Sequence, residues 1–481
     1  MKNDKHSPFQ SPWRYFFILG LGVFMSTLDS SIVNVVLPEI RGYFHADLHK
    51  VGWIPLSYLL TITVFLLVFG QMGDRLGRTK IYRTGLLIFT LGSFLCGVAP
   101  TLLILVLSRV VQALGAGMIM AIGPALLVDI FPANMRGRAI GAIGVVVNIG
   151  LTSGPLLGGL ITNALSWRFI FLVNLPFGVA TWWMARRLEQ VAPPKEDPSV
   201  SKKVDLAGAG LWCAALIILV LGLNRLPVWG FTFWPTGCLF LAGIIALTFF
   251  LFQERRASAP ILPLELFRTR LFNISLLGGT ILFVYTFIIV YLGPFYLSVL
   301  AGLPVNMVGA FYILAPLGSM MTAPISGRLY DKWGSRGLTA FGISVNCAAL
   351  FGFSSLGAEP SLILFGFLML TLGLGNGIFM PPNTSALLGI APRAYAGSAS
   401  GLLATGRNLG MLIGVAIGGS IFEMVYRYTT NGDTITNYDT ALHAQDFAGA
   451  WQAALWAGLL VCLISFFFNL LRGRESKRLR G

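Results

Sequence analysis

Long apolar stretches alternate with short polar connections along nearly the whole chain. A helix needs about 20 predominantly apolar residues to cross a bilayer, and fourteen stretches come close to that length or exceed it. The pattern therefore predicts an all-α polytopic membrane protein with fourteen transmembrane helices. The predicted spans are residues 14–37, 51–72, 80–99, 102–126, 138–161, 167–187, 205–224, 233–252, 272–297, 305–327, 337–357, 361–384, 397–422 and 450–471.

A glycine pattern in the fifth predicted span recurs in the thirteenth. Residues 148–161 read NIGLTSGPLLGGLI, and residues 408–421 read NLGMLIGVAIGGSI. Glycines four residues apart share one helix face and form a groove that lets a second helix backbone approach closely. Pro155, which lacks a backbone N–H and favours a kink, is matched in the second copy by Val415.

A second short sequence repeats at nearly the same offset, GDRLG at residues 73–77 and YDKWG at residues 330–334. Two different motifs that repeat at one offset indicate a duplicated architecture. We therefore expect two six-helix bundles that flank an inserted pair of spans. The expected division is an N-terminal bundle at residues 1–190, a linker with two inserted spans at 191–265, and a C-terminal bundle at 266–481.

Composition and charge support a membrane protein. Hydrophobic residues make up 56% of the chain and charged residues only 11%, with a mean hydropathy of +0.77, which excludes an ordinary soluble domain. The net charge of +15 would suit nucleic acid, but the basic residues lie in short connections between spans and form no basic domain, so we expect no nucleic-acid partner.

The connections on the side of the N-terminus carry most of the Lys and Arg residues, as cytoplasmic connections do. We therefore expect both termini in the cytoplasm and the chain in the bacterial cytoplasmic (inner) membrane. Lys2, Lys5 and Arg14 precede the first apolar run as in a signal peptide, but no small-x-small cleavage site follows, so we expect an uncleaved span. The basic residues on the opposite side are Arg41, Lys50, Arg168, Arg225 and Arg427.

Residues that carry enzyme or metal chemistry are sparse and scattered. The five cysteines lie singly in apolar runs, and the four histidines lie in the N-terminal tail or in connections. His45 and His49 have the i, i+4 spacing of metal ligands, but no third ligand is near them in the sequence. The sequence predicts neither a metal site nor an enzyme, and it predicts no cofactor.

Two ionisable residues lie well inside predicted spans, where charges are costly and usually functional. Asp29 in the first span and Arg109 in the fourth are about 12 Å and about 10 Å from the same face of the membrane, at 1.5 Å per residue. A close or water-bridged relation between them is therefore geometrically allowed. Asp29 would exchange a proton while Arg109 tunes its affinity; the alternative is a static ion pair. Glu39 and Glu423, at span ends, are expected to be solvated.

A second group of charged residues gathers at the ends of spans on the N-terminal side. Alternating charges there would form a latch that holds one conformation and breaks in the other, or would serve only to orient the chain. Gly70, Gly73 and Gly77 suit tight turns and close helix approach. The predicted gate comprises these glycines with Asp74, Arg75, Arg78, Asp129, Arg136, Arg138 and, in the second copy, Asp331 and Lys332.

Large apolar and aromatic side chains in the spans are candidates for a substrate cavity that accepts varied lipophilic compounds. A single residue of this kind more often serves plain helix packing. Span 305–327 contains no acid, so we expect neutral or singly charged substrates rather than dications. The candidates are Met25, Tyr58, Met118, Tyr285, Tyr291, Phe311, Tyr312, Phe379 and Met380, with Arg407 either binding an anionic substrate group or satisfying carbonyls.

Five ordered motifs resemble those of the major facilitator superfamily, and specifically the fourteen-span drug:proton antiporters of the EmrB/QacA type. Residues 28–38 (LDSSIVNVVLP) are similar to the span 1 motif LDxT(I/V)VNVALP, with Ser31 and Val36 replacing Thr and Ala. Residues 70–80 (GQMGDRLGRTK) resemble the loop 2–3 signature that gates conformational change, and residues 109–112 (RVVQ) match the span 4 motif RxxQG except for Ala113.

The other two motifs lie in the fifth and sixth spans. Residues 150–159 (GLTSGPLLGG) fit the antiporter motif GxxxGPxxGG, which is formed by Gly150, Gly154, Pro155, Gly158 and Gly159. Residues 167–178 (WRFIFLVNLPFG) resemble a stretch typical of the fourteen-span branch. The resemblance implies the fold, export by antiport, proton coupling by Asp29 and Arg109, and support of that coupling by Asn34 and Gln112.

The function expected from these features is proton-coupled multidrug efflux of lipophilic, neutral or monocationic compounds by alternating access. The protein would work as a monomer in the lipid bilayer, driven by the proton gradient, and the EmrB-like resemblance would imply a periplasmic adaptor in a double-membraned host. One alternative is a dedicated proton-coupled exporter of a single endogenous metabolite. Another is a non-transporting membrane receptor or subunit.

Overall fold

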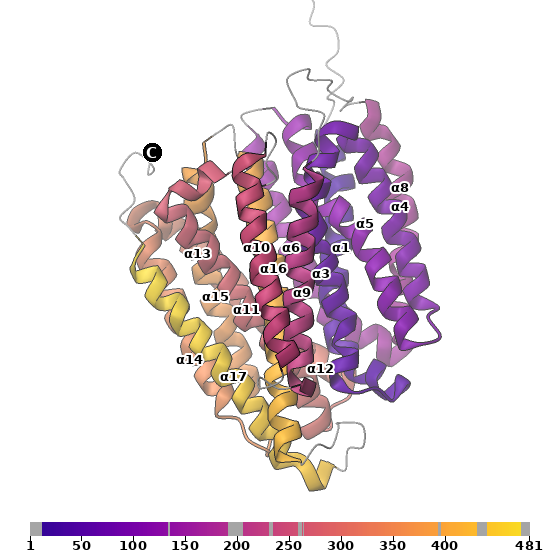
Figure 1. The fold of residues 1–481 in the computed structure, drawn as a ribbon, viewed down its shortest axis with the longest axis vertical. Helices are drawn as coiled ribbons and strands as arrows, with labels where there is room; N and C mark the ends of the chain where they lie inside the picture. The colour runs from indigo at the N-terminus through magenta and orange to yellow at the C-terminus, as the bar shows by residue number, and fades with distance from the viewer. Residues whose placement is uncertain are drawn as a thin grey trace, which may run out of the picture.

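The computed structural model describes residues 12–132, 135–190, 205–229, 234–257, 262, 264–392, 396–430 and 440–472 (Figure 1). Every regular element in these residues is helical, and thirteen helical segments are long and apolar enough to cross a membrane. The remaining predicted span, 80–99, corresponds to α4 (Arg78–Gly97), a helix of 20 residues. Its first turns carry Arg78, Lys80 and Arg83, which lower its hydropathy. The predicted all-α, multi-span fold is therefore confirmed.

The helices before residue 200 form one group, and those after residue 260 form a second. Helices α9 and α10 lie in front of the junction between the two groups (Figure 1). The first group contains α1 (Pro12–Phe44), α2 (Leu48–Val51), α3 (Trp53–Leu76), α4, α5 (Leu102–Ile130), α6 (Arg136–Ala164), α7 (Phe169–Leu172), α8 (Asn174–Met184) and the short η1 (Ala185–Gln190). The inserted pair is α9 (Leu206–Trp229) and α10 (Trp234–Arg256). The linker predicted at residues 191–203 lies outside the described residues.

The second group begins with the short η2 (Leu264–Arg268) and ends with the longest helices of the C-terminal half. We call the end of the molecule where α1 begins and α17 ends the terminal face, and the other end the opposite face. The helices are α11 (Arg270–Phe295), η3 (Tyr296–Leu300), α12 (Val305–Phe311), α13 (Leu314–Trp333), α14 (Ser335–Ser354), α15 (Leu362–Ile390), α16 (Ala396–Thr429) and α17 (Thr440–Leu470).

Two predicted spans are interrupted rather than continuous. Span 167–187 is divided into α7 and α8, and span 305–327 into α12 and α13. Each interruption lies just before a proline, Pro176 or Pro316, whose missing N–H leaves the carbonyl four residues earlier without its helical donor. Pro155, in contrast, lies inside the continuous helix α6.

The glycine groove of α6 receives α1. A Cβ atom on Gly154 would lie 2.8 Å from the backbone nitrogen of Ile32, and one on Gly158 would lie 2.8 Å from its carbonyl oxygen. The repeated glycines of α16 receive α11 in the same way, because Cβ atoms on Gly410 and Gly414 would lie within 3.0 Å of side chains of α11. The sequence repeat therefore corresponds to a repeated helix pair.

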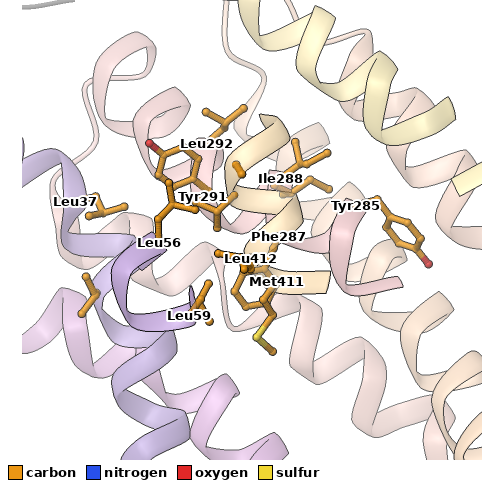
Figure 2. Close-up of a cluster of buried hydrophobic side chains, with 14 of the residues drawn as sticks. Leu37, Leu56, Leu59, Tyr285, Phe287, Ile288, Tyr291, Leu292, Met411 and Leu412 are labelled. Atoms are coloured by element: carbon orange, nitrogen blue, oxygen red, sulfur yellow. The ribbon is translucent and has the colours of Figure 1, made fainter. Parts of the chain in front are cut away.

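The two bundles meet closely at the opposite face. The Tyr291 hydroxyl donates a hydrogen bond to the Leu48 carbonyl at 3.4 Å, and a Cβ on Gly159 would lie 2.7 Å from the carbonyl of Val305. Figure 2 shows the apolar contact, with Leu56 and Leu59 of α3 facing side chains of α11 and α16. Apolar side chains and close backbones thus seal this end of the junction.

A buried charge lies at the same junction. Glu423, at the far end of α16, is 3% exposed and accepts hydrogen bonds from Arg427 at 2.9 and 2.8 Å. Nδ1 of His49, from the N-terminal bundle, lies 3.8 Å from the same carboxylate oxygen. The expectation that Glu423 is solvated is therefore wrong, because the contact between bundles covers a position that looks terminal in the sequence.

The inserted helix α9 is attached to both bundles. The indole N–H of Trp212 donates to the Thr63 carbonyl of α3 at 3.4 Å. Towards the other end of α9, the Leu223 carbonyl accepts from the Ser420 hydroxyl of α16 at 2.7 Å. The insertion therefore packs along the junction of the bundles rather than beside one of them.

Candidate functional site

Asp29 lies at the centre of a buried polar cluster in the N-terminal bundle. Its side chain is 0% exposed, and one carboxylate oxygen pairs with Nη1 of Arg109. The other oxygen accepts from Nε2 of Gln112 at 2.8 Å and from Nδ2 of Asn174 at 3.2 Å. The structure thus brings together the two intramembrane charges that the sequence placed at matching depths.

Arg109 is fixed by its own helix and by aromatic rings. Residues 109 and 112 are three apart in α5, so their side chains share one face, and Nη1 of Arg109 donates to Oε1 of Gln112 at 2.6 Å. The guanidinium lies 3.9 Å from the ring centroid of Tyr58 and 5.6 Å from that of Phe171. These contacts hold the cation in one orientation in a site with little solvent.

Two uncharged residues of this cluster were not predicted from the sequence. Asn174, which begins α8, contacts Asp29 directly, and the Ser93 hydroxyl of α4 accepts from Nε2 of Gln112 at 2.8 Å. Asn174 is a polar residue inside the apolar stretch 167–178. Its position indicates a candidate functional residue for the same reason as that of Asp29. Asn34 is not part of the cluster, because its Nδ2 donates to the Ser30 carbonyl at 3.0 Å.

The surroundings of Asp29 have opposing effects on its charge. Asp29 is surrounded by donors that favour the carboxylate, while burial away from water favours the neutral acid. A proton on Asp29 would remove the partner of a buried Arg109, whose charge would then need other acceptors. A proton on Asp29 would therefore weaken contacts that join α1 to α5 and α8.

The predicted gate is partly assembled at the terminal face. Nη1 of Arg78 donates to Oδ2 of Asp129 at 2.7 Å, which joins the start of α4 to the end of α5. Gly77 connects α3 to α4 with φ = 92°, a conformation that suits glycine. Its counterpart Gly334 connects α13 to α14 with φ = 75°, so the two sequence copies form the same turn.

The other predicted gate residues are placed as follows. A Cβ on Gly73 would meet the Ile122 side chain of α5, whereas one on Gly70 would meet nothing within 4 Å. The side chain of Asp74 lies outside the described part of the structure. Arg136, Arg138, Asp331 and Lys332 are exposed, and Arg75 is partly buried.

Replacing Arg78 with Ala is expected to change transport more than stability. The Arg78–Asp129 pair is partly exposed, with 30% and 24% of the two side chains accessible, and such pairs contribute at most about 1 kcal/mol. That energy shifts a two-state equilibrium by up to roughly fivefold. We expect the transport rate to change severalfold and the melting temperature to change little. Arg187→Ala, at an exposed residue of η1 outside the predicted gate, is the matched control, and an equal effect of both variants would contradict a latch.

The predicted cavity residues are mostly packed inside the protein. Met25, Tyr58, Tyr285, Tyr291, Tyr312 and Phe379 are buried, and Met118, Phe311 and Met380 are partly buried. The hydroxyl of Tyr58 donates to the Ser26 carbonyl at 2.9 Å, and that of Tyr312 to the Ile289 carbonyl at 2.8 Å. Their role in substrate binding stays a prediction.

A hollow of about 780 Å³ lies away from the Asp29 cluster, between α4 and α8. It is lined almost entirely by apolar side chains, and several of them, such as Leu91, Phe94 and Trp183, are exposed. In a membrane protein such a surface faces lipid. We therefore place the chemistry at the buried cluster and not at this hollow.

Residues 19–415 match the family model described as Major Facilitator Superfamily. The chain belongs to the major facilitator superfamily. It is therefore a multi-pass membrane transporter and not an enzyme. The family assignment agrees with the two bundles of repeated helix pairs described above.

Named relatives in this superfamily are similar over most of the chain. The riboflavin transporter RibZ of Clostridioides difficile (strain 630) is 33% identical over 469 residues, which cover 97% of this chain and 98% of that protein. The tetracenomycin C resistance and export protein of Streptomyces glaucescens is 31% identical over 412 residues, 84% of this chain and 75% of that protein.

A solved structure with the same fold is a bacterial homologue of the human lysosomal transporter Spinster, in an inward-facing and unoccupied conformation. It aligns with a TM-score of 0.68 at 15% identity and covers 97% of both chains. At this identity the likeness concerns the fold alone. It places the helices of this chain in the major facilitator arrangement.

Proposed function

We propose that this transporter is a proton-coupled antiporter that exports lipophilic compounds, in the manner of the fourteen-span drug:proton antiporters. The observation that carries the proposal is the buried cluster of Asp29 with Arg109, Gln112 and Asn174. An acid that is fully enclosed, paired with a cation and attached to several helices is suited to coupling a proton to a conformational change. The proton gradient would be the only energy source, without a cofactor.

In the proposed cycle, the terminal face is cytoplasmic, as the distribution of Lys and Arg indicates. A proton that reaches Asp29 from outside would neutralise the carboxylate, loosen its contacts with α5 and α8, and favour the conformation open to the cytoplasm. Proton release to the cytoplasm would restore the ion pair and favour export. Substrate and proton shift the equilibrium only by their differential affinity for the two states.

The proposed substrates are lipophilic and neutral or monocationic, because the helices offer apolar and aromatic side chains. The relative from Streptomyces glaucescens is a resistance and export protein, which supports export. A second candidate function is export of one endogenous metabolite. The relative that transports riboflavin, 33% identical over nearly the whole chain, favours a single metabolite as the substrate. We propose a monomer in either case, joined to a periplasmic adaptor if the host has two membranes.

The test uses purified protein in liposomes with an imposed pH gradient, with internal pH and a panel of fluorescent lipophilic compounds followed together. We expect compounds to move in the direction opposite to the proton flux. The pH gradient should dissipate in proportion to the amount of compound transported. Inhibition by many unrelated compounds would favour multidrug export, and inhibition by one metabolite would favour the second function. Substrate movement that leaves internal pH unchanged would overturn proton antiport.

A further inference from the structure

Arg407 is a cation inside the C-terminal bundle that the coupling cluster does not use. It lies in α16, eleven residues from the start of the helix at Ala396, or roughly 16 Å at 1.5 Å per residue. Its side chain is partly buried. Among the described residues it has neither a hydrogen bond nor an ion pair. A charge inside a membrane span usually has a partner or a function.

The neighbours of Arg407 on its helix fix the direction of its side chain. On one side, Gly406 and Gly410 pack on α11, where their Cβ atoms would lie within 3 Å of Thr280. On the other side lie Ala404 and Met411, three and four residues away and hence on the same part of the helix surface. Ala404 packs on apolar side chains of the N-terminal bundle, and Met411 belongs to a buried cluster that includes residues of both bundles. Leu59 of α3 belongs to the same cluster, which Figure 2 shows in part, and α16 contacts α3. Arg407 therefore points to the seam between α11 and the N-terminal bundle.

The buried acids near the junction are already neutralised. Asp29 pairs with Arg109, and Glu423 is bonded by Arg427. A buried charge without a counter-charge is costly unless a ligand supplies one. In transporters with this build, substrates bind at the interface of the repeats near the midplane. Arg407 lies at that interface, about five residues from the middle of α16 towards the terminal face.

We propose that Arg407 binds an acidic or strongly hydrogen-bond-accepting group of the transported molecule, such as a carboxylate, phenolate or imide oxygen. The planar guanidinium presents five donors in a fork that matches such groups. The substrate class is then an aromatic, amphiphilic compound with an acidic or acceptor end. This inference rests on the proposed transport function and changes its substrate class, because a cation at the seam repels monocationic compounds and favours compounds with an acidic or acceptor end.

The test compares three fluorescent probes that share one apolar group and differ only in the charge of the head: pyrenebutyrate, pyrenebutanol and pyrenebutyltrimethylammonium. Equilibrium binding to purified protein in lipid nanodiscs is measured by energy transfer from tryptophan to pyrene. A charge-assisted hydrogen bond contributes about 1.5–3 kcal/mol, which corresponds to roughly 10- to 150-fold in affinity. We expect wild type to bind the carboxylate more tightly than the alcohol by a factor in this range and to bind the ammonium most weakly.

Arg407→Gln is expected to remove the preference for the carboxylate and to leave the affinity for the alcohol within twofold. Arg407→Lys should retain part of the preference, because it keeps the charge and loses the fork. Equal affinities of wild type for carboxylate and alcohol, or a preference that survives in Arg407→Gln, would overturn the proposal.

A stability measurement separates ligand binding from a structural role. We expect Arg407→Gln to keep or raise the melting temperature, since it removes an uncompensated buried charge. Arg472→Gln is the control, because Arg472 is 1% exposed and donates to Ser275 at 2.6 Å and Asn383 at 3.1 Å; this variant should lower it. A loss of stability in Arg407→Gln as large as in the control would assign Arg407 to structure. Because binding is measured without a gradient, a failure of proton antiport in liposomes leaves this test intact.

Discussion

Asp29→Asn is expected to abolish proton-coupled transport while the protein still binds its substrates. The amide keeps the size of the side chain, but its NH2 group cannot accept the hydrogen bonds that one carboxylate oxygen accepts, and it cannot exchange a proton in the working pH range. In liposomes with an imposed pH gradient, we expect substrate flux and proton flux to be coupled in wild type. In the variant the gradient should no longer drive substrate movement, while substrate exchange without a gradient persists.

This substitution also changes stability. Removing one partner of a buried ion pair costs about 3–5 kcal/mol, because Arg109 would be left with neutral partners such as Gln112 and the ring of Tyr58. The melting temperature should therefore fall. Asp29→Glu, which keeps the charge, is the control and should recover part of the coupling. Equal gradient-driven transport by wild type and Asp29→Asn would make the pair static and place the coupling elsewhere.

The second large effect is expected from Gly158→Ala in the glycine groove of α6. The added methyl group would lie 2.8 Å from the Ile32 carbonyl and 2.9 Å from its Cγ1, so α1 and α6 would have to separate. Overpacking of this kind costs about 1–3 kcal/mol. Since α1 carries Asp29, the displacement of α1 would also move Asp29 relative to the other residues of the Asp29 cluster. We expect a lower melting temperature and a marked loss of gradient-driven transport.

The control for this variant is Gly144→Ala in the same helix. Gly144 is exposed, and a Cβ there would meet nothing within 4 Å. We expect the variant to keep wild-type stability and transport. If both alanine variants behaved alike, the effect would come from helix propensity and not from the contact between α1 and α6.

Much of the fold was predictable because a bilayer leaves few solutions for an apolar chain. The glycine repeat at residues 148–161 and 408–421 predicted matching helices, and the structure packs each against a counterpart, α1 or α11. The interruptions before Pro176 and Pro316 were missed because hydropathy does not register a missing backbone donor. Their position four residues after an orphaned carbonyl is a signal that the sequence does contain.

The candidate site was predictable only in part. The contact between Asp29 and Arg109 follows from two rare charges at equal depth, and the structure confirms that they touch. The contribution of Asn174 depends on which helices are neighbours, which periodicity cannot provide. Glu423 was misplaced for the same reason, since a position near a span end is exposed or buried according to what the other bundle puts against it.

The inserted helix α9 is bonded to both bundles and would therefore take part in any movement of one bundle relative to the other. The Trp212 indole donates a hydrogen bond to the Thr63 carbonyl of the N-terminal bundle. The Leu223 carbonyl accepts a hydrogen bond from the Ser420 hydroxyl of the C-terminal bundle. If the bundles rock, α9 must either bend or exchange one of these bonds during each cycle. The insertion would then add a free-energy barrier to the conformational change. The turnover rate would depend on a helix that contacts neither the proton nor the substrate.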